Sequence, residues 1–260
     1  MSTENPHQPP ADFAEGPNGA IAYLSHKGRA PGLVWLGGFR SDMRGGKANF
    51  VWSKAIADGR SCLRFDYSGH GESSGEFDEG TISSWTSDAE FMLDSKTDGP
   101  QILIGSSMGG WIAGLLALRR PERVAGLVLI APAPDFTSEL MAPQFSAAER
   151  EALEAEGKIS LPSEYSDEPA VITRALIEDG ARNRILSQNI PVAGPVRILQ
   201  GMADPDVPWR HGLRMAEIVE SADVAAVLVK HGDHRLSDED NLSRLAALID
   251  EVAARIEGGA

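Results

Sequence analysis

The sequence predicts an α/β protein whose mostly parallel central sheet is covered by helices on both faces. Short apolar segments alternate with segments of helical periodicity along most of the 260 residues, which is the order of elements in parallel sheets. Residues 124–130 contain no polar side chain, as is typical of a strand buried on both faces. A chain of this length suits one α/β domain, so we expect a single domain over residues 1–260.

The expected elements follow one another with short connections. Each predicted strand is a run of mainly apolar residues, and each predicted helix repeats apolar residues every three or four positions. Strands are expected at residues 21–24, 32–36, 62–65, 101–104, 124–130, 196–200 and 224–229. Helices are expected at residues 48–57, 83–93, 108–118, 213–219 and 242–256.

Residues 134–195 interrupt this alternation with a long, polar and helix-rich segment. Ser146 and Glu149 have the spacing of a capping box, Gly157 follows where that helix should end, and Pro169 is expected to open a second helix. The segment is too long for a plain connection between two strands. We therefore predict a helical lid over the carboxyl edge of the sheet, with an ordinary surface excursion as the alternative.

Two segments match Gly-x-Ser-x-Gly, a pattern in which a sharp strand-to-helix turn exposes a nucleophilic serine. One is centred on Ser73 and the other on Ser107. Ser107 follows an apolar strand and precedes an apolar helix, whereas Ser73 is followed by acidic residues and glycine. We therefore predict that Ser107 is a nucleophile and that Ser73 is a loop residue.

A serine hydroxyl needs a base to act as a nucleophile at neutral pH. In folds with this strand–turn–helix motif, the acid and then the histidine follow the serine along the chain. His231 and His234 both lie after the last predicted strand, and we favour His234 because it lies deeper in that loop. Asp204 and Asp206 are both candidates for the acid. We favour Asp204, although either aspartate could serve only to form a turn beside the neighbouring prolines.

An oxyanion hole needs two converging N–H donors. The backbone N–H of Met108, directly after the serine, is the first candidate, and the N–H of Phe39, in a glycine-containing loop, is the second. Arg40 in the same loop is expected either to contact the substrate or to pair with Asp42. Trp111 is expected near the oxyanion hole as an apolar substrate contact.

The composition excludes several classes of function. The formal net charge is −14, so nucleic acid and anionic membrane lipid are not expected as partners. We expect no membrane insertion, no cofactor and no metal, because no apolar run is long enough to span a bilayer and no phosphate-loop, dinucleotide or zinc spacing is present. The single cysteine, Cys62, and a polar N-terminal segment predict a cytoplasmic protein.

With these residues in place, the chain resembles the α/β-hydrolase superfamily. Within it, the chain resembles most the mitochondrial palmitoyl-protein thioesterases of the abhydrolase-domain group and their bacterial relatives. The resemblance implies a triad of Ser107, Asp204 and His234 that hydrolyses S-acyl thioesters, together with general carboxylesterase activity. It rests on GFRSDM (38–43), RFDYSG (64–69), GPQILIGSSMGGW (99–111), LPSEYS (161–166), GMAD (201–204), VPW (207–209) and KHGDHR (230–235).

We expect an acyl-enzyme mechanism acting on a small-molecule or acylated-peptide substrate, with the lid setting the preferred acyl chain length. The alternatives are a small-molecule carboxylesterase, a hydrolase of carbon–carbon bonds, and a non-catalytic binding protein of the same fold. The sequence does not indicate an oligomeric state. The apolar lid residues, which could also serve only to pack the lid on the sheet, include Leu153, Leu161, Tyr165, Ile172 and Leu176.

Overall fold

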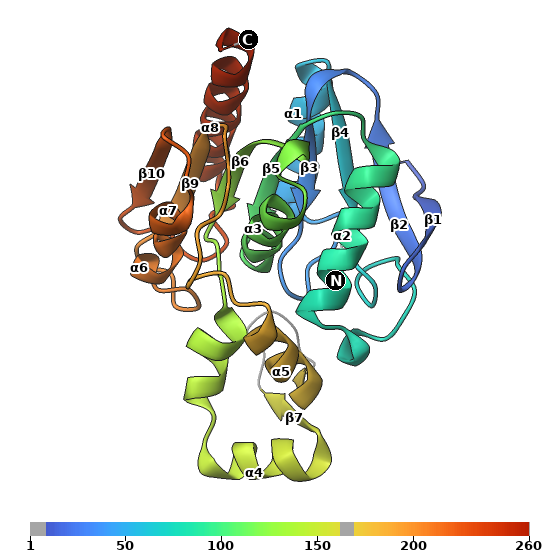
Figure 1. Cartoon of the computed structure of the whole chain (residues 1–260), viewed down its shortest axis with the longest axis vertical. Helices are drawn as coiled ribbons and strands as arrows, with labels where there is room; N and C mark the ends of the chain where they lie inside the picture. The colour runs from blue at the N-terminus through green and yellow to red at the C-terminus, as the bar shows by residue number, and fades with distance from the viewer. Residues whose placement is uncertain (1–8, 162–168, 260) are drawn as a thin grey trace.

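The computed structural model describes residues 9–161 and 169–259, and in this part of the chain an eight-stranded sheet is flanked by helices (Figure 1). The first three strands across the sheet pair antiparallel, and every later pair is parallel. The predicted α/β fold with a mostly parallel sheet is therefore confirmed. Across the sheet, the strands lie in the order β1 (Asp12–Gly16), β2 (Gly19–His26), β4 (Arg60–Phe65), β3 (Arg29–Leu36), β5 (Gln101–Ser106), β6 (Val124–Ile130), β9 (Val196–Gly201) and β10 (Val224–Val229).

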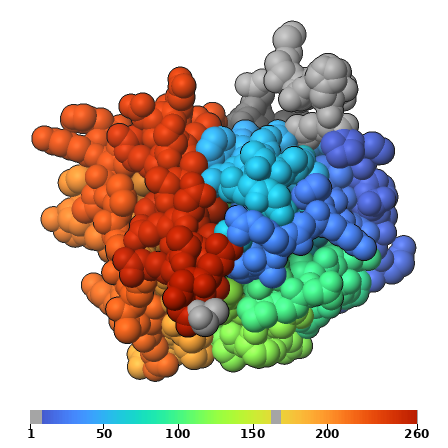
Figure 2. Space-filling view, turned by 90° about the horizontal axis from the view of Figure 1, so that it is seen from above, coloured from blue at the N-terminus to red at the C-terminus, as the bar shows by residue number. Residues whose placement is uncertain are grey.

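Helices cover both faces of this sheet. The larger ones are α1 (Gly46–Ala57), α2 (Ile82–Lys96), α3 (Met108–Arg119) and α8 (Glu239–Gly258). Side chains of β6 alternate between two cores: Val128 packs with residues of α1 and α8, and Leu127 packs with residues of α2 and α3. Because both faces of β6 are buried, the strand needs no polar position. Lys54 of α1 lies 2.5 Å from Asp250 of α8, and Figure 2 shows α8 (red) against the N-terminal half (blue and cyan).

The segment predicted as a helical lid leaves the sheet after β6 and returns to it at β9, and it projects beyond one end of the sheet (Figure 1). The capping box is confirmed, because Oγ of Ser146 accepts the N–H of Glu149 and the Glu149 carboxylate accepts the N–H of Ser146. Gly157 ends that helix with φ 77°. The lid contains a π-helical turn (Thr137–Met141), a 3-10 turn (Ala142–Gln144), α4 (Ala147–Glu156), β7 (Lys158–Leu161), β8 (Ala170–Thr173) and α5 (Arg174–Arg182).

The prediction that Pro169 opens a helix is wrong. The residues after it form β8, which pairs antiparallel with β7 and sets Ile172 opposite Ile159. The run of β-branched residues in β8 favours a strand. The helix begins only at Arg174, where the Thr173 side chain caps it by accepting the N–H of Leu176.

Two further elements differ from the sequence prediction. β1 was not predicted, and its single buried residue, Ala14, leaves almost no apolar signal. The helix expected at residues 213–219 is instead two short helices, α6 (Trp209–Gly212) and α7 (Arg214–Ile218).

Candidate active site

Ser107 lies at the turn between β5 and α3, as predicted. Its backbone has φ 54° and ψ −117°, a strained conformation that costs a non-glycine residue about 1–3 kcal/mol. A Cβ on Gly105 would lie 2.4 Å from the carbonyl oxygen of Gly109, and a Cβ on Gly109 would lie 2.0 Å from the carbonyl oxygen of Leu36. The two glycines of the motif are therefore required because the turn packs against its own backbone and against β3.

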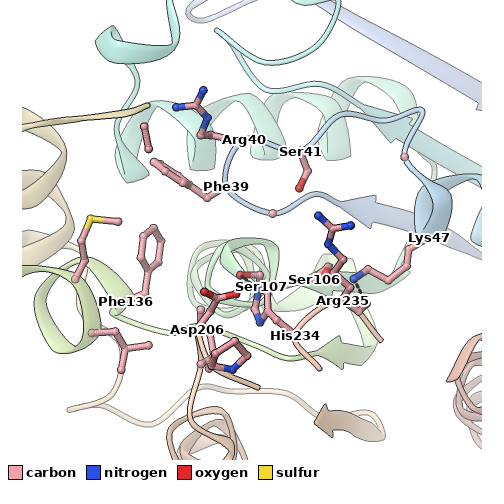
Figure 3. Close-up of a pocket in the computed structure, with 18 of the residues that line it drawn as sticks. Phe39, Arg40, Ser41, Lys47, Ser106, Ser107, Phe136, Asp206, His234 and Arg235 are labelled. Atoms are coloured by element: carbon pink, nitrogen blue, oxygen red, sulfur yellow. Dashed lines mark hydrogen bonds between the residues drawn. The ribbon is translucent and has the colours of Figure 1, made fainter. Parts of the chain in front are cut away.

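The Ser107 hydroxyl meets His234 at the carboxyl edge of the sheet (Figure 3). Nε2 of His234 lies 3.1 Å from Oγ of Ser107, and Nδ1 lies 2.8 Å from Oδ2 of Asp204. An ionised carboxylate only accepts hydrogen bonds, so Nδ1 carries the proton and Nε2 is left to accept from the serine. The structure thus joins the three favoured residues in one hydrogen-bonded chain. The alternative His231 is exposed, and no hydrogen bond within the described residues links it to this chain.

Asp204 is buried and held by several donors. Its Oδ1 accepts the N–H groups of Asp206 at 2.9 Å and Val207 at 2.8 Å, and its Oδ2 accepts Nε2 of Gln200 at 3.2 Å. These donors stabilise the ionised carboxylate and fix its orientation toward His234. Asp206, the alternative acid, therefore supports Asp204 through its backbone, while its side chain lines a neighbouring cavity.

Ser73, the serine of the second Gly-x-Ser-x-Gly segment, forms hydrogen bonds with backbone groups. Oγ of Ser73 accepts the N–H of Ala22 at 2.9 Å and donates to the carbonyl oxygen of Asp66 at 2.7 Å. The buried carboxylate of Asp66 accepts the N–H groups of Met43 and Glu72, and burial raises the pKa of Asp66 to about 6. The prediction that Ser73 is a loop residue is confirmed.

The loop after β3 lies against the nucleophile turn. A Cβ on Gly38 would lie 3.4 Å from Cβ of Ser107. This loop carries the N–H of Phe39, and the N–H of Met108 belongs to the first turn of α3, where it has no partner within the helix. Both predicted oxyanion donors therefore come from backbone segments that adjoin Ser107.

His70 fixes the position of that loop. Its Nδ1 donates to the carbonyl oxygen of Ser68 at 3.2 Å, which leaves Nε2 to accept the N–H of Arg40 at 3.3 Å. Burial lowers the pKa of His70 to about 4, so the ring keeps its acceptor nitrogen at neutral pH. The sequence indicated only a structural role for His70, and its bond to this loop depends on tertiary contacts that no local pattern reveals.

A cavity of about 770 Å³ opens beside Ser107 and His234. Figure 3 shows Phe39 and Phe136 on one side of Ser107, and Lys47 and Arg235 on the other. The lining from the lid is mainly apolar, with Gln144 and Glu149 as its polar members, and the lining near the start of α1 and the loop after His234 is polar. The apolar lining of the cavity includes Phe39, Phe136, Met141, Phe145, Leu161 and Ile172.

The lid residues proposed from the sequence divide into two groups. Leu161 and Ile172 line the cavity, whereas Leu153 and Leu176 are buried in the packing of the lid. Tyr165 and most of the lid motif at residues 161–166 lie outside the described residues. Leu161 and Ile172 can therefore contact a substrate in the cavity, whereas Leu153 and Leu176 stabilise the lid by packing.

The prediction of Trp111 as a substrate contact is wrong. Trp111 is fully buried and is not among the cavity-lining residues. It lies one helical turn beyond the nucleophile, and its indole faces the core beside Phe136. Its Nε1 donates to the carbonyl oxygen of Asn183 at 3.0 Å, so Trp111 joins α3 to the end of the lid.

Arg40 lines the cavity, but its guanidinium is engaged with the lid. It donates to the carbonyl oxygen of Pro169 at 3.1 Å and lies 5.3 Å above the ring of Phe77. The expected pair with Asp42 does not form among the described residues, and the Asp42 side chain accepts the N–H of Arg44 instead. Arg40 therefore connects the loop after β3 to β8.

One group in the described part of the chain has the composition of a metal site. Oxygen and nitrogen atoms of Asp204, Asp206 and His234 lie within 4.8 Å of one another. Most of these atoms already take part in the hydrogen bonds that join Asp204 to His234 and to backbone N–H groups.

Among the residues that the structure describes, no helix is long and apolar enough to cross a membrane.

Comparisons with known proteins identify the family. A family model described as the alpha/beta hydrolase fold matches residues 37–175. The chain is 37% identical over 237 residues to the mitochondrial palmitoyl-protein thioesterase ABHD10 of Homo sapiens, covering 91% of this chain and 77% of that protein. A solved putative hydrolase from Agrobacterium vitis S4 superposes with a TM-score of 0.89 at 44% identity, covering 95% of this chain and 100% of that one. The mouse alpha/beta hydrolase domain-containing protein 10 gives 0.85 at 36% identity, with 93% and 97% covered. The chain therefore belongs to the alpha/beta hydrolase family and is a hydrolase.

Proposed function

We propose that this hydrolase cleaves S-acyl thioesters of small molecules or peptides through an acyl-enzyme on Ser107. The observation that carries the proposal is the hydrogen-bonded chain from Asp204 through His234 to Ser107 at a cavity with one apolar side. Relatives named palmitoyl-protein thioesterases, at 37% and 38% identity, support the thioester as the substrate bond.

The residues have complementary roles in the proposed reaction. Nε2 of His234 takes the hydroxyl proton of Ser107 while Oγ bonds to the acyl carbon, and Asp204 stabilises the resulting imidazolium. The N–H groups of Phe39 and Met108 stabilise the oxyanion. Collapse of the intermediate breaks the carbon–sulfur bond, and the sulfur takes the proton from His234. Water then attacks the acyl-enzyme with the same assistance, which releases the acid and restores Ser107.

The apolar side of the cavity accommodates the acyl chain. Phe136, Leu161 and Ile172 line it from the lid, and this side lies across Ser107 from the polar side (Figure 3). Each buried methylene contributes about 0.8 kcal/mol. Since this binding is retained in the transition state, each methylene raises kcat/KM by roughly fourfold until the chain reaches the end of the cavity.

The test is a series of acyl thioesters and matched oxygen esters, from two carbons upward and below the concentration of micelle formation. We expect kcat/KM to rise by about fourfold per methylene and then level off, with thioesters preferred at each length. A flat or falling profile from the shortest chain contradicts the apolar acyl side. A consistent preference for oxygen esters makes the protein a carboxylesterase, and the absence of turnover of both series contradicts the proposed acyl transfer.

Two lid variants form a matched control for this series. Leu161 lines the cavity, whereas Leu153 is buried away from it. Leu161→Ala should therefore reduce the gain per methylene for chains that reach the lid. Leu153→Ala should destabilise the lid without changing that dependence. Equal effects of the two variants on the chain-length profile would indicate that the lid acts only through its packing.

A further inference from the structure

The predicted oxyanion donor, the N–H of Phe39, lies in a tight turn of the loop after β3 (Figure 3). The N–H of Ser41 donates to the carbonyl oxygen of Gly38 at 3.1 Å, so the segment between them is a β-turn. Of its two central residues, only Arg40 has a positive φ, 59°. Such a turn is of type II, which favours glycine in its third position because other residues are strained there. An arginine is therefore held in a strained conformation directly beside an oxyanion donor.

Positive φ angles at residues other than glycine are confined to the surroundings of the site. Within residues 9–161 and 169–259, the residues concerned are Arg40, Ser107, Ala131, Asp135 and Leu236. Each of them follows the carboxyl end of β3, β5, β6 or β10. Strained residues persist only where the surrounding structure holds them, and they cluster at functional sites. The contacts that hold Arg40 are thus of functional interest.

His70 favours one of the two forms that this turn could take. In a type I turn, the central peptide between Phe39 and Arg40 is reversed relative to type II. In the observed form, that peptide directs the N–H of Arg40 to Nε2 of His70 at 3.3 Å, and the reversed peptide would direct the carbonyl oxygen of Phe39 there. Because Nδ1 of His70 donates to the carbonyl oxygen of Ser68, Nε2 carries no proton and cannot bond to a carbonyl oxygen. His70 therefore favours the form that is strained at Arg40.

The ring of His70 is itself firmly placed. Only 3% of the residue is exposed, and its ring centroid lies 5.0 Å from that of Phe77 and 5.1 Å from that of Trp85. Nε1 of Trp85 donates at 3.1 Å to the same carbonyl oxygen of Ser68. The acceptor that faces the turn is thus held by aromatic packing and by a hydrogen bond on the far side of its ring.

We propose that His70 is a positioning residue for the oxyanion hole, because it holds the strained turn that places the N–H of Phe39 beside Ser107. The inference rests on the proposed acyl transfer and adds to it a residue that does not line the cavity. The oxyanion forms only as Oγ of Ser107 bonds to the acyl carbon. A displaced donor therefore raises the barrier without weakening the binding of substrate, so loss of His70 should lower kcat and leave KM nearly unchanged.

Two substitutions of His70 separate its acceptor from its packing. His70→Phe keeps an aromatic ring in the cluster and removes the acceptor, so kcat should fall by about ten- to a hundredfold. His70→Gln offers an amide oxygen to the N–H of Arg40 and should keep kcat within a few-fold of the unmodified enzyme. His211→Phe is the matched control, since His211 is also buried and bonds to a backbone carbonyl oxygen, that of Pro134.

Substitutions of Arg40 test the turn itself. Glycine adopts a positive φ without strain, so Arg40→Gly should raise kcat several-fold in the His70→Phe protein. Arg40→Ala removes the same guanidinium, with its contacts to Pro169 and Phe77, but keeps the strain, so it should raise nothing. Arg40→Pro, at an exposed position, excludes a positive φ and removes the N–H, so alone it should lower kcat as far as His70→Phe does. Equal effects of Arg40→Gly and Arg40→Ala in the His70→Phe protein overturn the proposal.

A pair of inhibitors reports on the oxyanion hole directly. Oγ of Ser107 adds to the carbonyl carbon of an alkyl trifluoromethyl ketone, its proton passes to Nε2 of His234, and the ketone oxygen becomes an oxyanion in the hole. The methyl ketone of the same chain length has a less electrophilic carbonyl and binds without this adduct. In His70→Phe, the inhibition constant of the trifluoromethyl ketone should rise by the factor by which kcat falls. That of the methyl ketone should stay unchanged, and His211→Phe should leave the ratio of the two constants as it is.

The inhibitor ratio separates positioning from a general disturbance of the fold. An unchanged ratio in His70→Phe, or a parallel rise of both constants, overturns the proposal. The proposed function is tested separately by the substrate bond: hydrolysis of an oxygen ester with no turnover of any thioester refutes the thioesterase. The same variants are then compared on that ester, where the role of His70 predicts the same changes in kcat and in the ratio.

Discussion

The chain contains the pattern Gly-x-Ser-x-Gly twice, and the two copies fold for different purposes. Ser107 has a strained backbone, and its hydroxyl lies 3.1 Å from Nε2 of His234. Ser73 uses its hydroxyl to tie two backbone segments together. In the first copy the glycines let a strand, a turn and a helix meet. In the second, Gly71 lets the turn close on Asp66, since a Cβ at Gly71 would lie 2.1 Å from that carboxylate.

The difference shows that the pattern specifies a tight turn. The neighbouring elements determine whether the serine hydroxyl meets a base or bonds to the backbone. Ser107 is followed by α3 and faces the loop after the last strand, so a base can reach its hydroxyl. Ser73 is followed by a short 3-10 turn, Phe77–Glu79, and its hydroxyl is taken up by backbone groups. Strain is thus retained at the serine whose hydroxyl faces the cavity.

The largest expected difference between the two turns is the effect on kcat when each serine is replaced by alanine. Ser107→Ala should lower kcat by about 10⁶. Ser73→Ala should keep kcat within a few-fold but lower the free energy of unfolding by about 1–3 kcal/mol, because the N–H of Ala22 loses its acceptor. Steady-state kinetics on one activated ester and urea unfolding measure both quantities. An inactive Ser73→Ala that folds normally would reverse the assignment.

The two candidate acids, Asp204 and Asp206, and the two candidate bases, His234 and His231, can be compared in the same way, and the expected effects on kcat are the next largest. Asp204→Asn should lower kcat by about 10⁴ because the histidine loses its correct tautomer, and His234→Ala should lower it by more. Asp206→Asn should be mild, since it leaves the N–H that Asp204 accepts, and the exposed His231 should tolerate alanine. These variants can be compared on the same ester, and a severe loss at His231 with a mild one at His234 would contradict the geometry.

The smallest expected effect is a pH dependence of stability at the second turn. The pKa of Asp66 is about 6 in the folded protein, against an ordinary 3.8, so the folded state holds the proton more tightly. The stability from Asp66 is therefore fully present below about pH 4 and is lost as the pH rises through 6. The unfolding free energy of the unmodified protein relative to Asp66→Asn should fall by about 2 kcal/mol from pH 4 to 7. Urea unfolding measures this difference, and a rise with pH would be the opposite sign.

The sheet and the serine–histidine–aspartate chain could be predicted from the sequence because their signals are local. Residues 124–130 are apolar throughout, and Ser107 is flanked by a strand and a helix. The sequence predicts a helix after Pro169, but the β-branched run that follows it forms the lid strand β8. The contact of Lys47 with Arg235 joins residues 188 positions apart, so no local pattern could reveal it. The cytoplasmic location and the single domain stay predictions.

The assignment of Ser107 is tested most directly by a fluorophosphonate probe followed by mass spectrometry of the digested protein. The probe reacts only with an activated serine, so we expect one adduct, on the peptide that contains Ser107, and its loss in His234→Ala. The peptide that contains Ser73 should stay unmodified. An adduct on Ser73, or a protein that hydrolyses thioesters while Ser107 stays unlabelled, would contradict the assignment of the nucleophile.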